Sequence, residues 1–318
     1  MCWPARHECF GGAEGALRAK QAYARVARAI SGFEPVTLAA RPLDVSEARL
    51  ATGGKVEVAE VPLDDSWARD FGPTFLTGTN HRLAGVHWIF NAWGRKYHPY
   101  ANDTNFARRV LEAAGGIVYA APLVCEGGAL HTDGQGTVLT TEQCLLNTNR
   151  NPGLKREDVE DVLRLYLGTR KAIWLGDGFV DDETDGHVDN IACFAAPGRV
   201  ILGIPPRTHP DSVSVQEALR RLKTARDAEG RSLEVIELPQ PRKTRQSWSG
   251  VLLPASYVNF YLVNGGVIMP AFDDRNDEQA RTILAQCFPD RDIMQVDALD
   301  IVQGGGGIHC ITQQEPLP

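Results

Sequence analysis

The chain has 318 residues and a formal net charge of −7, with 43% hydrophobic and 23% charged residues. This composition is ordinary for a globular protein that buries a sizeable core. The acidic balance disfavours nucleic acid as the main partner and is compatible with a cationic substrate.

The number and spacing of the seven cysteines indicate the redox environment of the protein. Their number is odd, no pair has CxxC spacing, and several lie in apolar segments, so we expect reduced thiols in the cytoplasm and no disulfide framework. The N-terminus MCWPARHECF contains no apolar stretch of the kind found in signal peptides. No apolar run approaches the length of a membrane span, so we expect no membrane partner.

Hydrophobic periodicity predicts helices and strands that alternate along the whole chain. Helices are predicted over 17–31, 46–52, 104–114, 156–167, 213–228 and 277–287. Strands are predicted over 36–39, 56–61, 74–76, 116–121, 137–141, 171–175, 191–195, 199–204, 233–238, 257–263, 267–272 and 293–296.

Five of these strands begin similar units, near positions 56, 117, 171, 233 and 293. Their spacing of roughly 60 residues is in the range where repeats indicate arrays or propellers. Some units contain a hairpin, as at the Asn264-Gly265 turn signal. Hairpins favour mixed sheets arranged in a ring over a doubly wound parallel sheet, in which single strands alternate with helices. No linker is evident, so we expect one domain over 1–318.

Polar residues follow the first strand at matching places in successive units. These are Asp70, Glu126 and the pair His187 and Asp189, and the last unit places Cys310 there. A ring of units would bring them toward a common axis. Taken singly, each has an ordinary structural interpretation: an ion pair with a neighbouring arginine, a turn residue, or part of a buried network.

The tail GGGGIHCITQQ, residues 304–314, carries the thiol. Four consecutive glycines bring no side chains to a core, so they indicate a close approach or a sharp bend. The isoleucines that flank His309-Cys310 predict the start of a strand, on which His309 and Cys310 would face opposite sides. The base for Cys310 should then come from elsewhere. The segment is either a cradle for a nucleophile or a glycine-rich turn before a buried cysteine.

One thiol, one imidazole and three carboxylates together favour chemistry on a guanidinium. Cys310 would be the nucleophile, His187 the general acid and base, and Glu126 would orient the His187 ring. Two further carboxylates in one pocket, Asp70 and Asp189, need a cation between them, and a planar guanidinium matches carboxylates bidentately.

At these residues the chain resembles the agmatine deiminases of the guanidine-modifying, or pentein, superfamily. The resemblance covers almost the whole chain, from Trp3 to Pro316. It is carried by DDSWARDFGPTF (64–75), CEGGALHTDGQGTVLTT (125–141), CLLNTNRNP (144–152), TDGHVDNIACF (184–194), ASYVNFYLVN (255–264) and GGGGIHCITQQEP (304–316). It implies a five-bladed α/β propeller with a cysteine hydrolase site on its axis.

The resemblance also implies hydrolysis of agmatine to N-carbamoylputrescine and ammonia, with no cofactor and no metal, by a homo-oligomer. It gives Cys310, His187, Asp70, Asp189 and Glu126 the roles named above. Trp67 would line the path of the substrate, and Glu183 or Asp185 would face its distal amine. Gly307 is a departure, because the family usually has Asn there and any polar contact from that side chain is missing.

Three alternatives remain at this stage. A related enzyme could act on peptidyl-arginine or free arginine, although free arginine would need a cation for its carboxylate. A guanidine-binding protein without turnover would not need Cys310 and His187 together with the Asp pair. A propeller used only for protein interaction would have no reason to bury carboxylates on its axis without a ligand.

Overall fold

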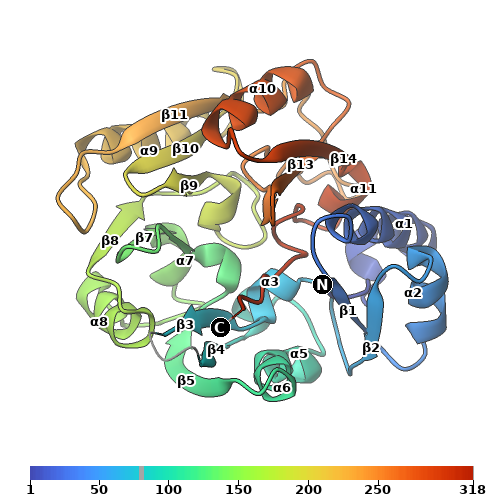
Figure 1. Ribbon diagram of the computed structural model, residues 1–318. Coiled ribbons are helices and arrows are strands. Elements are labelled where there is room, and N and C mark those ends of the chain that lie inside the picture. The colour runs from blue at the N-terminus through green and yellow to red at the C-terminus, as the bar shows by residue number, and fades with distance from the viewer. Residues whose placement is uncertain (79–81, 318) are drawn as a thin grey trace.

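The computed structural model describes residues 1–78 and 82–317. Within these residues, fourteen strands form five small sheets. The sheets lie in sequence order around a central axis, and helices α2, α6, α8, α9 and α10 lie toward the rim (Figure 1). This confirms the predicted five-bladed α/β propeller.

The helices and strands follow the chain from the first sheet to the fifth. The helices are α1 (Ala13–Ile30), α2 (Val45–Thr52), α3 (Ala68–Phe71), α4 (Ala92–Arg95), α5 (Ala101–Thr104), α6 (Phe106–Ala113), α7 (Glu142–Leu145), α8 (Arg156–Leu167), α9 (Ser212–Thr224), α10 (Asp277–Cys287) and α11 (Leu299–Val302), with short 3₁₀ turns η1 (Glu8–Phe10), η2 (Gly127–Ala129) and η3 (Val188–Asn190). The strands are β1 (Thr37–Ala40), β2 (Glu57–Glu60), β3 (Thr74–Thr77), β4 (Leu83–Ile89), β5 (Ile117–Val124), β6 (His131–Thr132), β7 (Thr137–Thr141), β8 (Lys171–Leu175), β9 (Ala192–Ala196), β10 (Arg199–Ile204), β11 (Glu234–Pro239), β12 (Tyr261–Val263), β13 (Gly266–Ala271) and β14 (Asp292–Asp297).

Four sheets share one topology. An antiparallel hairpin comes first, the chain then passes through a helix, and a third strand returns parallel to the second strand of the hairpin. A parallel return requires such a crossover. The first sheet has only the parallel pair β1 and β2, extended by an isolated bridge between Cys2 and Ala39.

This topology corrects the predicted phase of the repeat. The strands near 56, 117, 171, 233 and 293 are β2, β5, β8, β11 and β14, and each closes a sheet instead of opening one. The predicted period was right because the closing strands begin at similar intervals along the chain, although the crossovers differ in length. The phase was wrong because the pairing partner of a strand depends on tertiary contacts that its own residues do not encode.

Most helix boundaries match the predicted ones. Helices α8 and α10 have the predicted limits, and α8 ends where Gly168 takes a left-handed conformation at φ 68°. The predicted helix 213–228 ends early, at Thr224, because Asp227 instead accepts the backbone N–H groups of Glu229 and Arg231 in a turn. No helix of the described residues is long and apolar enough to span a bilayer.

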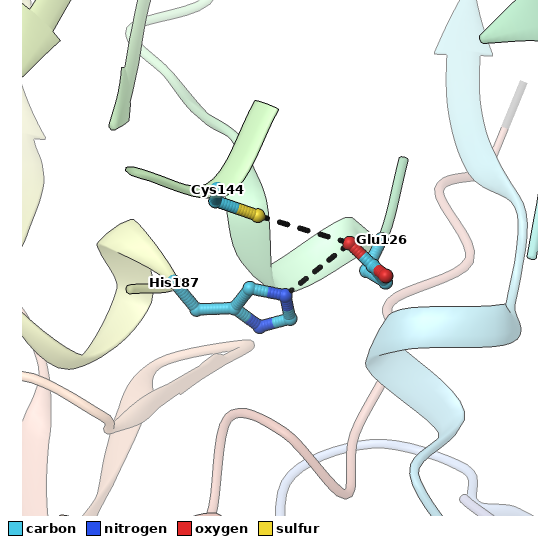
Figure 2. A group of neighbouring side chains, drawn as sticks. All are labelled: Glu126, Cys144 and His187. Atoms are coloured by element: carbon cyan, nitrogen blue, oxygen red, sulfur yellow. Dashed lines mark hydrogen bonds and ion pairs between the residues drawn. The ribbon is translucent and has the colours of Figure 1, made fainter. Parts of the chain in front are cut away.

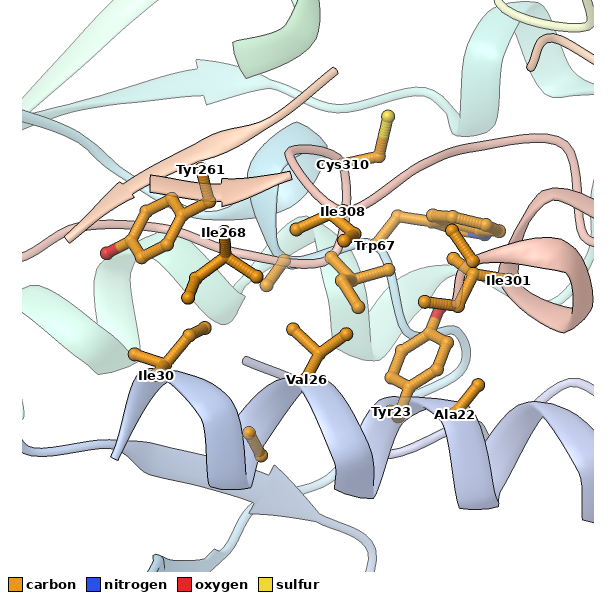
Figure 3. Close-up of a cluster of buried hydrophobic side chains, with 14 of the residues drawn as sticks. Ala22, Tyr23, Val26, Ile30, Trp67, Tyr261, Ile268, Ile301, Ile308 and Cys310 are labelled. Atoms are coloured by element: carbon orange, nitrogen blue, oxygen red, sulfur yellow. The ribbon is translucent and has the colours of Figure 1, made fainter. Parts of the chain in front are cut away.

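Helix α1 supports the centre of the ring from one side. Its apolar face, with Tyr23, Val26 and Ile30, packs against Ile268 of β13 and against Ile308 of the tail (Figure 3). The Tyr23 hydroxyl also lies 3.1 Å from Ser66 Oγ, one residue before Trp67. Apolar burial therefore fixes the two segments that carry Trp67 and Cys310.

The tail differs from its prediction, since residues 304–314 contain no strand and run as turns. Their backbone groups bond to other segments instead of a sheet. The His309 N–H donates to Asn259 O at 3.1 Å, and the Arg69 N–H donates to Cys310 O at 3.0 Å. The predicted strand 257–263 is shortened to Tyr261–Val263 for the same reason, because the backbone at Asn259 serves the tail.

Candidate active site

The thiol of Cys310 lies at the centre of the ring and is 3% exposed. Its Sγ is 3.3 Å from Asn259 Nδ2 and 3.6 Å from Asp189 Oδ2. Burial raises the pKa of the thiol well above its usual value, and the charges of Asp189 and Asp70 raise it further, while the Gly307 backbone N–H and Asn259 oppose them. Cys310 is therefore protonated until a cation offsets the two carboxylates.

The ring of His187 is fully buried between two carboxylates. Its Nδ1 lies 3.6 Å from Asp70 Oδ1, and its Nε2 lies 3.5 Å from Glu126 Oε2. Burial disfavours the charged ring, but Asp70 and the contacts with Cys144 and Glu126 outweigh burial and raise the pKa of His187 well above its usual value. The ring can thus hold a proton near neutral pH, as a general acid requires.

Glu126 contacts Nε2 of the His187 ring, and Cys144 contacts the same carboxylate (Figure 2). The other oxygen of Glu126, Oε1, lies 2.7 Å from Nε of Arg150, and both side chains are fully buried. Burial alone would raise the pKa of Glu126, but the charges of Arg150 and His187 outweigh it and lower that pKa. Glu126, Cys144 and His187 also have the spacing of metal ligands. A metal ion there would face the Arg150 guanidinium, so the cluster is better suited to orienting an imidazole.

Asp70, Asp189 and His187 surround one small space beside Gly128. A Cβ atom at Gly128 would lie 2.5 Å from His187 Nδ1, 2.9 Å from Asp70 Oδ1 and 3.1 Å from Asp189 Oδ2. Any larger residue would therefore collide with all three side chains. The structure brings together the paired carboxylates that the sequence predicted, and glycine keeps the space between them open.

Two polar atoms in this space have no hydrogen-bond partner. Among the described residues these are Nδ1 of His187 and Oδ1 of Asp189, both shielded from solvent, while Nε2 of His187 faces Glu126 on the other side of the ring. Buried polar atoms are nearly always satisfied in folded proteins. Unsatisfied donors and acceptors around paired carboxylates are what a planar cationic group would complete.

Trp93 fixes the orientation of Asp70. Its Nε1–H donates to Asp70 Oδ2 at 2.9 Å, while the Gly128 N–H donates to Asp70 Oδ1 at 3.1 Å. Trp93 takes a left-handed backbone conformation with φ 51°, which is uncommon for a bulky residue and costs free energy. The sequence analysis did not identify Trp93, because its role depends on this local conformation.

A narrow cavity leads to Cys310. It is lined by Cys9, Trp67, Asp70, Trp93, Tyr97, Glu183, Thr184, Gly304, Gly305, Gly306 and Cys310. Trp67 stacks on Phe10 with ring centroids 6.2 Å apart, and a Cβ atom at Gly306 would lie 2.5 Å from Trp67 Cζ3. The glycine run therefore lets the backbone approach the indole closely enough to leave a narrow cavity.

The two carboxylates predicted to face the distal amine have different surroundings. Glu183 lines the cavity and a wider outer cavity, and it accepts a hydrogen bond from the Tyr97 hydroxyl. Asp185 Oδ2 instead pairs with Arg150 Nη1 at 2.6 Å and Lys96 Nζ at 2.9 Å. Two cations already compensate Asp185, so of this pair only Glu183 is placed to meet a cationic group.

Sequence reasoning missed three further residues of this centre. Asn259 contacts the thiol, Arg150 neutralises Glu126, and His309 lies with Nδ1 2.7 Å from Asp189 Oδ2. Asn259 and Arg150 stand inside the ASYVNFYLVN and CLLNTNRNP segments, so their position in those motifs was an available signal. A Cβ atom at Gly307 would lie 2.4 Å from Asn259 Oδ1, so the Asn259 amide occupies the space beside this glycine.

The ionisation of Asp70 should make the stability of the fold depend on pH. Burial, with the nearby charges of Asp189 and Glu126, raises the pKa of Asp70 from 3.8 to about 6 against the opposing effect of His187. The folded state then binds this proton more tightly than the unfolded state. Asp70 contributes most stability below about pH 4, and its contribution is lost as the pH rises through about 6.

We expect Asp70→Asn to remove this pH dependence. The difference in unfolding free energy, variant minus wild type, should rise by on the order of 3 kcal/mol between pH 4 and pH 8. Urea unfolding across that range measures it, and Asp161→Asn, at an exposed carboxylate of α8, is the matched control. A difference that stays flat or falls with pH would contradict the raised pKa of Asp70.

Comparison with known proteins places this centre in a family. The model of the Porphyromonas-type peptidyl-arginine deiminase family matches residues 1–316. The agmatine deiminase of Pseudomonas aeruginosa (strain LESB58) is 43% identical over all of this chain and 92% of its own length. That of Stutzerimonas stutzeri (strain A1501) is 44% identical with the same coverage.

Solved structures agree with these relatives. The Enterococcus faecalis agmatine deiminase superposes with a TM-score of 0.95 at 38% identity, over 100% of this chain and 92% of its own. A cysteine-to-serine variant of the C. jejuni agmatine deiminase with substrate bound gives a TM-score of 0.87 at 27% identity, over 98% of this chain and 91% of its own. With a family model over 1–316 and full-length relatives above 40% identity, the chain belongs to the Porphyromonas-type peptidyl-arginine deiminase family.

Proposed function

We propose that the protein hydrolyses agmatine to N-carbamoylputrescine and ammonia through a covalent intermediate on Cys310. One observation carries the choice of substrate. The inner and outer cavities are lined by carboxylates, aromatic rings and neutral groups, with no Arg, Lys or His among their described lining residues. Agmatine has a cation at each end and no anion, so it matches such a path.

The guanidinium is expected between Asp70 and Asp189, where bidentate hydrogen bonds to carboxylates fit its planar shape. Its charge would offset the two carboxylates that raise the pKa of Cys310. The substrate itself would thereby favour the thiolate, and the nucleophile would form only when the guanidinium carbon is within reach.

Two steps then follow. As the guanidinium binds, the Cys310 thiol releases its proton to solvent; the sulfur then attacks the guanidinium carbon and forms a C–S bond, and His187 donates a proton to the departing nitrogen, whose C–N bond breaks to release ammonia. A water molecule, deprotonated by His187, next attacks the thiouronium carbon. The C–S bond breaks and the new hydroxyl group gives its proton to the departing sulfur, which restores the Cys310 thiol and leaves N-carbamoylputrescine. Glu126 keeps the ring oriented in both steps, because Arg150 holds its carboxylate ionised.

The methylene chain of agmatine would run past Trp67, and its ammonium would approach Glu183. The outer cavity adds Glu8, Asp181 and Asp182 to this acidic end. Free arginine would bring a carboxylate toward these acidic groups, where it meets like charges. The name of the matching family keeps peptidyl-arginine as the second candidate substrate, and an arginyl peptide carries no such free carboxylate.

We expect agmatine to be preferred over arginine by at least about a hundredfold in kcat/KM, equivalent to about 2.7 kcal/mol. Glu183→Gln should narrow this gap, because it weakens the site for the ammonium selectively. Ammonia release with agmatine, arginine and a blocked arginyl peptide measures the preference, and Glu157→Gln at an exposed site on α8 is the control. Comparable rates with either arginine substrate would refute the assignment of agmatine.

The remaining predictions concern the cellular compartment, the oligomeric state and the domain organisation. The seven cysteines are all free, which fits the reducing cytoplasm in which we place the protein. A homo-oligomer and a single domain over 1–318 also stay predictions. Light scattering and limited proteolysis would test them.

A further inference from the structure

A second cavity reaches the candidate active site at Asp189. Its lining includes Arg69, His131, Asp189, His309 and Gln314, with apolar residues such as Phe260. None of its lining residues belongs to the cavity that leads to Cys310. The proposed mechanism assigns this second cavity no task.

Neighbouring residues divide between the two cavities. Asp70 and Cys310 line the first, whereas Arg69 and His309, one position before each, line the second. Asp189 stands between them, because its Oδ2 lies 3.6 Å from Cys310 Sγ and 2.7 Å from His309 Nδ1. Asp189 therefore lines the second cavity and contacts the thiol that lines the first.

The position of His309 is tightly fixed. Its backbone N–H donates to Asn259 O at 3.1 Å and to Asn259 Oδ1 at 2.9 Å, and its carbonyl accepts from Arg69 Nε at 3.4 Å. The side chain is 14% exposed, toward the second cavity. Since an ionised carboxylate only accepts hydrogen bonds, Nδ1 must carry the proton in the contact with Asp189.

This contact uses one oxygen of Asp189 and leaves the other open. Oδ2 is held by His309, while the buried Oδ1 has no partner among the described residues. Burial works against ionisation of Asp189, but the hydrogen bond and charge of His309 outweigh it and lower the pKa of Asp189. An ionised carboxylate with one oxygen fixed and one unpaired is suited to hold a guanidinium in one orientation.

We propose that His309 is a positioning residue, which holds Asp189 for the guanidinium from behind and is reached by solvent through the second cavity. The inference deepens the proposed function and rests on it. Without the imidazole, Asp189 could rotate about its side-chain torsions, and the guanidinium carbon would no longer be fixed relative to Cys310 Sγ. Misplacement by about 1 Å can reduce a rate on the order of a hundredfold.

The test compares two variants at this position. His309→Ala should lower kcat/KM for agmatine by about thirtyfold or more, with a fall in kcat as well as a rise in KM. His309→Asn should stay within about fivefold of wild type, because its Nδ2 can take the place of Nδ1 as donor. Imidazole added to His309→Ala should restore kcat in a saturable manner, since the ring it replaces lies at the second cavity.

His131→Asn is the matched control. His131 lines the same cavity with its ring centroid 6.4 Å from that of His309, and the Asn oxygen can still accept the Phe194 N–H that Nδ1 accepts now. Its activity should match wild type and show no response to imidazole. Thermal unfolding of each variant identifies any that fails to fold; if His309→Ala does, His309→Leu, which fills the space without a donor, carries the test with the same expected loss.

The possible results separate the positioning role of His309, the access through the second cavity and the proposed function. Wild-type kcat/KM in a folded His309→Ala, or an equal loss in His309→Asn, would overturn the positioning role. A loss that imidazole leaves unchanged would overturn access through the second cavity. A wild-type protein without turnover of agmatine would contradict the proposed function instead, so the two failures are distinguishable.

Discussion

Cys310→Ser should abolish ammonia release from agmatine and leave the fold intact. A serine hydroxyl at this buried position, beside Asp189 and Asp70, would have to ionise against the same carboxylates from a far higher pKa than a thiol. We expect turnover to fall by more than about a thousandfold, which is about 4 kcal/mol of transition-state stabilisation. Steady-state ammonia release measures the loss.

Mass spectrometry makes this prediction specific to a covalent step. An acid-quenched reaction should show an adduct on the wild-type protein and none on Cys310→Ser. Cys287→Ala is the control, because Cys287 is also buried but lies in α10 at the rim of the ring. Full activity in the serine variant would end the covalent mechanism.

His187→Gln should lower kcat by about a hundredfold to ten-thousandfold, the usual range for loss of a general acid and base. Glutamine fills much of the space but cannot give a proton to the departing nitrogen or take one from water, the tasks proposed for the imidazole that lies 3.6 Å from Asp70 and 3.5 Å from Glu126. Because His187 would assist both steps, neither ammonia release nor hydrolysis of the intermediate should remain fast. Single-turnover kinetics separates the two.

His87→Gln supplies the matched change for this experiment. His87 lies in β4, where its Nε2 is 2.8 Å from Thr104 O, and a glutamine amide can make the same bond. Its activity should stay within about twofold of wild type. If His187→Gln were as active as His87→Gln, proton transfer would have to be assigned to another group.

The convergence of the candidate site residues was more predictable from sequence than the phase of the repeat. Asp70, Glu126, His187 and Cys310 stand at comparable places after strands, and a ring requires such places to converge. Convergence needs only the period, and the period is given by the similar intervals between the closing strands. The phase of the repeat depends on which strands pair within a sheet. That pairing is determined by contacts between separate segments of the chain.

The role proposed for His309 could not be predicted from its local sequence. On a strand it would have faced away from the centre, and its side chain does point to a different cavity from that of Cys310. The segment is a turn, however, and Asp189 stands where both side chains can contact it. Trp93 was missed for a similar reason, because its left-handed backbone conformation has no signature in residue type.

The contact between Arg69 and His309 joins residues 240 positions apart, across the point where the last segment of the ring meets the first. Closing so long a loop is entropically costly before any other contact offsets the cost. The nucleophile thus reaches Asp70 only in a chain whose ring has closed. In partly assembled chains the thiol would lack the burial and the carboxylates that raise its pKa, so Cys310 should react faster with thiol reagents before the ring closes than after.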